Sequence, residues 1–578
     1  MRPLIYENVN VDSELAYRLL KSYARLEGKE YRPESIFGMD QHGWPGDWEG
    51  RTILALVLLA RATGRKPAFL KRRLNCLEEE VNERGYLKGI MPEGEADEQQ
   101  LSGHSWLLRG LLEYYLWTGE RKCEKRIKEI VKNLYLPVKG MYGNYPLKEK
   151  VRKREGGEAG NLQEGVVNGW HLSSDIGCSY ICMDGLSQYY EVFRDPEVEE
   201  LLDEMCENFQ KIDFLGASMQ THASLTACRG VLRYYRCTGR KELLDFSKRL
   251  FDYYQDYGMT ENYANFNWFG RPYWTEPCAV IDSYMIAMQL FMATGEHAYL
   301  DIANRIYFNG ICHGQRFNGG FGCDFCAGAQ PVQKFLGVKE KAYEAYWCCS
   351  MRGVEGLTYA AVCGVLEDGK DMYITGPASG TYTDGNMSLQ ISSDDWIEGR
   401  QKILVTKCTS TEINASYENA FEKDKTGENA AKEKTSCRIF CYLPENCDEA
   451  VTLTRNGLQE AAFVEKGWIV ISAEEGDVLE VAFRMGFQVK PPVSKTTDAG
   501  FKTYWHGVQM LGVHTVGSES GVAAADEPAG QEATMNEETL TYLGKGVYTD
   551  GVHMLRPFGD SIYLEKRDLI RRKVQVLF

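Results

Sequence analysis

A repeated helical hairpin is the feature of this sequence that most restricts how the chain can fold. In each repeat an apolar helical run ends in a turn and a second helix follows. Glycine after the last apolar residue stops a helix, because it adopts the left-handed conformation without strain. The turns are Thr63-Gly64, Thr118-Gly119, Thr238-Gly239 and Thr294-Gly295, with Arg194-Asp195-Pro196 as a degenerate version. At least five hairpins are predicted between about residue 12 and residue 365.

Such hairpins can close into a toroid of inner and outer helices, or they can stack as an open solenoid. The connections between these hairpins are long and unlike one another, which favours the toroid. In a toroid the connecting loops and the ends of the inner helices line a central pocket. We therefore expect functional side chains near the starts of inner helices.

The pattern changes near Asp368, where short segments of alternating polarity begin. These segments predict strands separated by Gly, Asp and Asn turns, and Asn456-Gly457 is a good hairpin turn. The predicted strands include Ser388–Ile391, Lys402–Thr406, Ser436–Leu443, Ala450–Leu453, Gly467–Ile471 and Val478–Phe483. We predict a helical domain over 1–365 and one or more β-sandwich domains over 366–578. The charged segment 422–434 and the Ala-, Gly- and acid-rich segment 518–538 are predicted to be mobile loops.

Composition narrows the function. The 578 residues carry a net charge of -16, which argues against nucleic acid and anionic membranes as partners. The sequence begins without a signal-peptide pattern, and no apolar run approaches the length of a membrane span, so we expect a cytoplasmic protein. In that compartment the 18 cysteines are expected to be free thiols, ligands or catalysts rather than disulfides.

Two predicted helix starts carry the strongest chemical signal: Glu276-Pro277-Cys278 and Cys348-Cys349. The free N–H groups and the dipole at a helix start favour negative charge and lower the pKa of a thiol. One carboxylate and three thiols could bind a zinc ion, usually as a tetrahedron. The alternative is that these cysteines are small buried apolar residues. A second alternative is a structural four-cysteine zinc site made of Cys323, Cys326, Cys348 and Cys349. The cysteine spacing makes this ligand set less favoured than the first.

Several other side chains could line the pocket. Glu261 lies in an Asn-rich and aromatic segment, where a carboxylic acid with a raised pKa could serve as a general acid; as a lone Glu it could also be merely solvated. His104 and His222 each stand near the start of a predicted inner helix, either in the pocket or as helix caps. His171 is a weaker candidate of the same kind. Tryptophans such as Trp48 could stack on sugars or belong to the core.

Together these motifs resemble glycoside hydrolase family 127, the β-L-arabinofuranosidase family, which is related to family 146. The resemblance covers nearly the whole chain and is most specific at Thr275–Ile281, at Tyr299–Asn309 and at the Cys-Cys helix start. It implies a mainly α N-terminal (α/α)6 barrel followed by a C-terminal β-sandwich. It also implies a retaining, exo-acting hydrolase whose cysteine nucleophile is held at a zinc ion, Zn2+.

The resemblance assigns roles to individual residues. Cys348 would be the nucleophile and Glu261 the general acid/base. The zinc ligands would be Glu276, Cys278, Cys348 and Cys349, and the expected substrate-binding residues are His104, His222, Asn304, Trp48 and His171. The chain departs from the family pattern at Tyr346, where a third cysteine is usual, at Asn304, where a sugar-contacting Glu is usual, and at Cys178, where a His is usual. We therefore expect the chemistry to be retained and the sugar, a terminal furanose or related pentose, to differ.

Two other kinds of function remain open. A non-catalytic carbohydrate-binding protein with a structural zinc would bind sugar without hydrolysis. A lyase or isomerase of the helical-toroid type would use Tyr and His as acid and base and would not need the Cys-Cys pair. In each case the expected partner is a small oligosaccharide or glycoside, with no nucleic acid or membrane, and the large β-sandwich is compatible with a homodimer.

Overall fold

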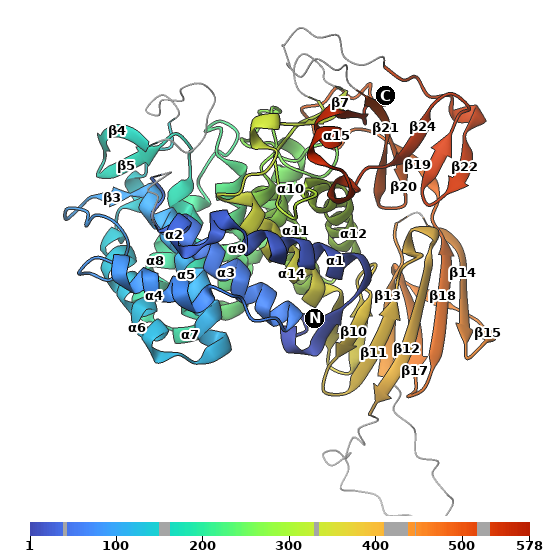
Figure 1. Cartoon of the computed structure of the whole chain (residues 1–578), viewed down its shortest axis with the longest axis horizontal. Coiled ribbons are helices and arrows are strands. Elements are labelled where there is room, and N and C mark those ends of the chain that lie inside the picture. Colours follow the sequence, from blue (N-terminus) through green and yellow to red (C-terminus); the bar gives the residue numbers. More distant parts are fainter. Residues whose placement is uncertain (38–42, 149–161, 329–333, 410–436, 446, 517–531) are drawn as a thin grey trace, which may run out of the picture. The chain divides into compact units, whose positions relative to one another are not determined.

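The computed structural model describes residues 1–37, 43–148, 162–328, 334–409, 437–445, 447–516 and 532–578 (Figure 1). Its contacts divide these residues into two compact units. The first comprises Met1–Ser13 and Ala361–Gly486, and the second comprises Glu14–Ala360 and Phe487–Phe578.

Helices that alternate between buried and half-exposed make up most of the second unit. The inner helices, buried on nearly every side, are α3 (Asp47–Thr63), α5 (Glu98–Thr118), α7 (Cys182–Phe193), α9 (Thr221–Thr238), α11 (Pro277–Thr294) and α14 (Cys349–Cys363). The outer helices, which leave one face exposed, are α1 (Ser13–Leu26), α4 (Leu70–Glu80), α6 (Arg121–Ile130), α8 (Pro196–Phe209), α10 (Lys241–Tyr257) and α12 (His297–Ile306). Helix α3 packs on α5, α5 on α7, α7 on α9 and α9 on α11. Helix α14 closes the ring, since Thr52 on α3 bonds Met351 on α14 and Gly356 on α14 lies against Ile281 on α11. This arrangement confirms the predicted helical toroid.

The Thr-Gly turns have a common geometry that explains both residues. The glycines adopt left-handed φ angles of 68°, 70°, 71° and 71° after α3, α5, α9 and α11. Each threonine hydroxyl donates to the carbonyl four residues earlier, as Thr63 does to Leu59 at 2.6 Å, and accepts from the amide two residues later. The hydroxyl thus closes the last helical turn while the glycine reverses the chain.

Helices α3 and α5 approach each other through glycine. A Cβ atom at Gly50 would lie 2.1 Å from the backbone nitrogen of Leu107, and one at Gly103 would lie 2.2 Å from the carbonyl oxygen of Pro45. At Gly110 the added atom would lie 2.8 Å from the Gly50 carbonyl. No other residue type fits at such distances, because the two backbones are in direct contact.

The first unit is a β-sandwich of two sheets. One has the strand order β1-β8-β9-β13-β17-β16 and the other β15-β14-β18-β12-β11-β10-β2. Burial alternates along β12 and β18, as expected where one face of a sheet is covered. The strands are β1 (Arg2–Pro3), β2 (Val9–Val11), β8 (Val365–Asp368), β9 (Asp371–Ile374), β10 (Gly380–Thr383), β11 (Met387–Ser392), β12 (Arg400–Cys408), β13 (Cys437–Tyr442), β14 (Asp448–Arg455), β15 (Leu458–Glu460), β16 (Phe463–Glu465), β17 (Trp468–Ala473) and β18 (Val478–Arg484).

These bounds confirm the predicted strands, and Asn456-Gly457 does join β14 to β15, with both residues at positive φ. The structure adds what the sequence did not indicate: β1 pairs with β8 and β2 with β10, so residues near the N-terminus belong to the sandwich. The division into domains at residues 365 and 366 stays a prediction about which parts fold independently. The predicted mobile loops, 422–434 and most of 518–538, lie outside the described residues.

A further sheet belongs to the second unit. Its order is β22-β23-β24-β21-β25-β7-β6, and β20 pairs with β21 and β19. The strands are β6 (Asp324–Phe325), β7 (Phe335–Val338), β19 (Phe487–Lys490), β20 (Thr503–His506), β21 (Gln509–Val516), β22 (Thr541–Gly544), β23 (Val547–Thr549), β24 (Met554–Pro557) and β25 (Arg572–Gln575). A small sheet in the order β3-β5-β4 also lies in this unit, with β3 at Ala96–Asp97, β4 at Leu162–Val167 and β5 at Trp170–Ser173.

Helix α11 corrects one expectation. By length and composition, Pro277–Thr294 is apolar and long enough to span a membrane, contrary to the expectation from the sequence. However, 83% of this helix is buried inside the protein, as is usual for the central helix of a globular fold.

Candidate metal and thiolate site

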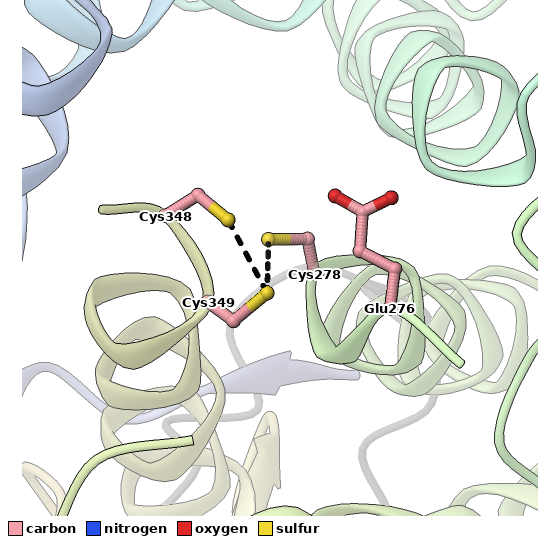
Figure 2. A group of neighbouring side chains, drawn as sticks. All are labelled: Glu276, Cys278, Cys348 and Cys349. Atoms are coloured by element: carbon pink, nitrogen blue, oxygen red, sulfur yellow. Dashed lines mark hydrogen bonds between the residues drawn. The ribbon is translucent and has the colours of Figure 1, made fainter. Parts of the chain in front are cut away.

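The predicted ligands come together in the structure. Glu276, Cys278, Cys348 and Cys349 each offer one ligand atom, and these atoms all lie within 4.8 Å of one another (Figure 2). We call this set the glutamate–thiol cluster. Glu276 and Cys278 stand at the start of α11, and Cys348 and Cys349 at the start of α14. The sulfur atoms are 3.6 Å apart for Cys278 and Cys349 and 3.3 Å apart for Cys348 and Cys349, so the thiols are in contact without a disulfide bond.

Mutual contact among the thiols decides which of them is charged. Hydrogen bonds from Cys278 and then Cys349 lower the pKa of Cys348 to about 6, although burial opposes the shift. Burial raises the pKa of Cys278 to about 11 and raises the pKa of Cys349 well above its usual value. Burial, with the nearby Cys278 and Asp175, likewise raises the pKa of Glu276. Among the three thiols, Cys348 is therefore the one whose surroundings favour the thiolate.

The cluster fits a divalent metal ion. Zinc bound at about 2.3 Å from each thiolate requires sulfur–sulfur separations of about 3.8 Å in a tetrahedron. The observed 3.3 and 3.6 Å are close to that value. Three sulfurs and one carboxylate oxygen are a donor set that zinc accepts. Burial, and after it the neighbouring acidic groups, disfavour negative charge on Glu276, Cys278 and Cys349, and a bound cation would offset both effects.

The alternative four-cysteine site does not form among the described residues. Cys326 Sγ points to the Asn265 carbonyl at 3.8 Å, outside the cluster. Cys323 contributes a hydrogen bond to the shift in the pKa of Cys349 and so lies beside the cluster. All 18 cysteines fall within the described residues and are free, as the sequence predicted.

Arg51 on α3 contacts the cluster and was not predicted. Its Nη1 donates toward Cys278 Sγ at 3.7 Å, and its Nη2 lies 3.4 Å from His222 Nε2. Both carboxylate oxygens of Asp47 accept from Arg51 Nε at 2.9 Å. The guanidinium is 4.1 Å from the centre of the Trp106 ring. Only its position on α3, one residue after Gly50, could have drawn attention to it in the sequence.

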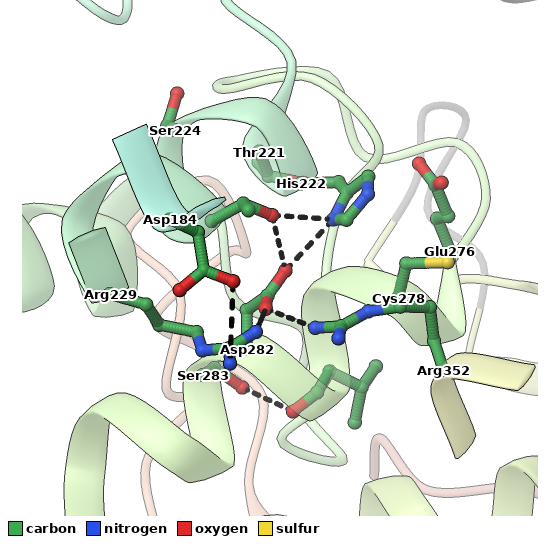
Figure 3. A network of polar contacts seen from close by, with 12 residues as sticks. Asp184, Thr221, His222, Ser224, Arg229, Glu276, Cys278, Asp282, Ser283 and Arg352 are labelled. Carbon is green, nitrogen blue, oxygen red and sulfur yellow. Dashed lines mark hydrogen bonds and ion pairs between the residues drawn. The ribbon is translucent and has the colours of Figure 1, made fainter. Parts of the chain in front are cut away.

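His222 lies beside the cluster and is connected to Asp282. Its Nδ1 is 2.8 Å from Asp282 Oδ2, an oxygen that also accepts from Thr226 Oγ1 at 2.8 Å. Because an arginine can only donate, His222 Nε2 accepts from Arg51 and Nδ1 carries the proton. Figure 3 shows His222, Arg229 and Arg352 converging on Asp282. Although burial opposes it, Arg352, His222 and Arg229 hold the pKa of Asp282 below its usual range.

Asp282 belongs to a central ionic network of buried charges that joins five inner helices. Arg229 bonds both Asp282 and Glu355 at 2.8 Å, and Glu355 also pairs with Arg109 at 3.2 Å. The network comprises Arg109 on α5, Asp184 on α7, Arg229 and Arg233 on α9, Asp282 on α11, and Arg352 and Glu355 on α14. Sequence reasoning missed all seven residues, because their partners lie on different helices.

His104 takes a different position from the one expected of a sugar-binding group. Its ring is fully buried, its Nδ1 lies 2.8 Å from the Gln100 carbonyl, and its Nε2 accepts from the Leu87 amide at 2.9 Å. Both ring nitrogens are therefore used by backbone. Burial lowers the pKa of His104 to about 4.

The remaining predicted substrate residues lie in three places. His171 on β5 pairs with Glu95 at 2.7 Å and is partly exposed. Asn304 is buried on the outer helix α12 and donates to the Leu300 carbonyl at 3.1 Å. Trp48 on α3 packs against Tyr346 with ring centres 5.9 Å apart. The role of each in substrate binding stays a prediction.

Glu261 is buried in the loop before α11. Its carboxylate accepts from Val493 N at 2.6 Å, Ser494 N at 3.3 Å and Thr497 Oγ1 at 2.7 Å. Burial raises its pKa, and these three donors act against the shift. No residue of the glutamate–thiol cluster contributes to this shift in the pKa of Glu261.

Asp175 is a second buried carboxylate and was not predicted. Trp268 Nε1 donates to its Oδ1 at 3.2 Å, and Gln220 Nε2 donates to its Oδ2 at 3.2 Å. The same Gln220 nitrogen lies 3.4 Å from Glu276 Oε2. Gln220 thus connects Asp175 to the cluster. The nearby Gly177-Cys178, which departs from the family pattern, was the one sequence signal for this region.

Comparison with known proteins supports the same reading of the chain. Residues 261–361 match the family model described as the β-L-arabinofuranosidase GH127 catalytic domain. This segment contains Glu261 and all four residues of the glutamate–thiol cluster. The protein is a glycoside hydrolase resembling family 127. No curated protein sequence matches the chain.

Solved structures share the fold of this glycoside hydrolase. A family 127 β-arabinofuranosidase is 13% identical with a TM-score of 0.66, and the match covers 100% of this chain and 97% of the other. A family 127 β-L-arabinofuranosidase from Geobacillus stearothermophilus T6 is 12% identical with a TM-score of 0.61, and the match covers 99% of each chain. At this identity the likeness shows a common fold over the full chain.

Proposed function

We propose that this glycoside hydrolase is a retaining, exo-acting enzyme that removes a terminal furanose or related pentose, with Cys348 as nucleophile. The observation that carries the proposal is the convergence of three thiols and Glu276, whose ligand atoms all lie within 4.8 Å of one another. The match of residues 261–361 to the β-L-arabinofuranosidase catalytic-domain model supports the same class of substrate.

The proposed metal is zinc, held by Glu276, Cys278, Cys348 and Cys349. Bound zinc would keep the thiolates deprotonated and fixed in position at neutral pH. The fit of the donor set to a tetrahedral ion supports this choice.

The reaction follows a double displacement. The Cys348 thiolate attacks the anomeric carbon and forms a C–S bond, while the bond from that carbon to the leaving oxygen breaks. A carboxylic acid of the protein gives its proton to the leaving oxygen. The resulting carboxylate then takes a proton from water, whose oxygen attacks the anomeric carbon and releases Cys348 as thiolate.

Two carboxylates are candidates for this acid/base. Glu261 is the residue that the family resemblance implies, and burial raises its pKa, which suits a general acid. Asp175 has the closer link to the cluster, through Gln220. We retain Glu261 as the proposed acid/base and test Asp175 beside it. Glu261→Gln should slow substrates with poor leaving groups by about 10²- to 10⁴-fold, whereas the same loss in Asp175→Asn alone would transfer the role to Asp175.

The deciding experiment is a screen of aryl furanosides and pentosides together with metal analysis of the same sample. We expect turnover of at least one furanoside or pentoside and about one zinc per chain. Cys348→Ser should lower kcat by at least about 10³-fold while the folded structure persists, and Cys76→Ser, a change far from the cluster in sequence and outside it in space, is the matched control. Full activity in Cys348→Ser would contradict the proposal. Sugar binding without any hydrolysis would favour the carbohydrate-binding alternative.

A further inference from the structure

We infer that Arg51 is a positioning residue of the glutamate–thiol cluster, supplying the buried positive charge that holds Cys278 and its neighbouring thiolates in place. This inference rests on the proposed function, because it concerns the cluster in its metal-binding form. It assigns a role to a side chain that neither the family resemblance nor the sequence pattern indicated.

The charge of the cluster creates the need for such a partner. Three thiolates and one carboxylate carry four negative charges, and a divalent cation balances only two of them. Cys278 and Cys349 are buried, so solvent cannot screen the remainder. A buried charge without a partner is strongly destabilising, which predicts a cation in direct contact with the cluster.

Arg51 has the position that this argument requires. Its side chain is only 5% exposed, and its Nη1 lies 3.7 Å from Cys278 Sγ, the distance of an N–H···S hydrogen bond. A donor to a metal-bound thiolate reduces the charge on the sulfur and orients it, as outer-shell partners of metal ligands do.

Arg51 is itself held on three sides. Asp47, one turn earlier on α3, accepts from its Nε with both oxygens at 2.9 Å. The Trp106 ring lies 4.1 Å from the guanidinium carbon, close enough for a cation–π contact. His222 Nε2 accepts from the second guanidinium nitrogen, Nη2, at 3.4 Å. The fork of the guanidinium therefore links Cys278 to His222 and, through His222 Nδ1, to Asp282.

This arrangement distinguishes a positioning role from a purely structural one. A structural arginine would affect stability alone, whereas Arg51 should change the affinity and the electronic environment of a metal at Cys278. Arg51→Gln removes the charge, and Arg51→Lys keeps it but cannot reach Cys278 and His222 together. Arg61, at the other end of α3 and paired with Glu113 at 3.2 Å, gives the matched control Arg61→Gln.

The experiment titrates the purified apoprotein with Co2+ and records the thiolate-to-cobalt charge-transfer absorption, with thermal unfolding measured on each variant. Arg51→Gln should weaken cobalt binding by about 10- to 100-fold and shift the absorption band, and Arg51→Lys should weaken it by about threefold to tenfold. Arg61→Gln should bind like the wild type.

Three other outcomes would contradict either the inference about Arg51 or the proposed metal site. If the wild type binds cobalt and Arg51→Gln binds it as tightly with the same spectrum, the inference is overturned while the proposed function stands. If the wild type binds no cobalt or zinc, the proposed metal site fails and the inference fails with it. If Arg51→Gln does not fold, Arg51→Lys is read alone, and a cobalt affinity equal to that of the wild type overturns the inference.

Discussion

His104 and His222 both lie in the N-terminal half of a buried inner helix, yet their surroundings give the two rings different hydrogen-bond partners. Backbone groups use both ring nitrogens of His104, which is neutral and enclosed. Side chains surround His222: Asp282 fixes its proton on Nδ1, and Arg51 joins its Nε2 to the glutamate–thiol cluster. The position of a histidine in a helical repeat thus does not determine its role, because its partners come from other parts of the chain.

The largest expected effect comes from removing the charge that orients His222. Asp282→Asn should lower the free energy of unfolding by about 3 to 5 kcal/mol, because Arg229 and Arg352 would be left buried with less negative charge to balance them. Urea unfolding measures this loss. The control is Asp203→Asn, whose half-exposed pair with Arg240 should be worth less than about 1 kcal/mol. Equal losses in the two variants would contradict the account of the central ionic network.

Because burial favours the neutral form of His104, the stability of the protein should depend on pH. Its pKa is lowered to about 4 in the fold from 6.5, so the unfolded chain binds more protons between these values. Stability should therefore fall as the pH drops from about 7 to about 4, by up to about 3 kcal/mol from this group. Protonation would place a hydrogen on Nε2, where the Leu87 amide donates.

Unfolding of the wild type and of His104→Asn across this pH range isolates the contribution of the histidine from that of the carboxylates. The difference in stability between the two proteins should narrow as the pH falls. A constant difference from pH 7 to pH 4 would mean that the pKa of His104 is the same in the folded and the unfolded chain, so that folding does not disfavour its charged form.

The two histidines should also differ in their effect on activity, and here the larger loss is expected at His222. His222→Asn should lower kcat/KM by about 100-fold, equivalent to about 2.7 kcal/mol, because Arg51 and Asp282 both lose the partner that connects them. Initial rates on the best substrate of the screen measure this. A His222→Asn variant with wild-type kcat/KM would exclude His222 from the site.

The smallest effect on activity is expected for His104→Asn. This variant should lose about 1 to 3 kcal/mol of stability, from the unsatisfied Leu87 amide, while kcat/KM of the folded protein stays within about threefold of the wild-type value. If instead its KM rose strongly with stability unchanged, the role that the family resemblance implies, contact with a sugar hydroxyl, would be restored.

The sequence predicted those parts of the molecule that local pattern controls. Helix ends at Gly64, Gly119, Gly239 and Gly295 follow from the conformational freedom of glycine, and they are where the repeat placed them. Most strands of the sandwich were predicted for a similar reason, since alternation along a strand reflects a single buried face.

The glutamate–thiol cluster was predicted because each half is a short motif at a helix start. Arg51, His222 and Asp282 could not be connected in this way. Their contacts join residues 60 to 227 positions apart, and no local pattern marks which side chains of different helices will meet. The pairing of β7 with β25 was missed for the same reason, since these strands are far apart in sequence and their pairing is set by the whole fold.

The glycine contact between α3 and α5 ties helix spacing to the electrostatics of the thiols. Gly50 immediately precedes Arg51, and an alanine methyl there would overlap the α5 backbone. Relieving that overlap would move α3 outward and carry the guanidinium away from Cys278 Sγ. Gly50→Ala changes no metal ligand, yet it would weaken metal retention. The absence of a methyl group at residue 50 thus determines how closely the Arg51 guanidinium approaches Cys278 Sγ.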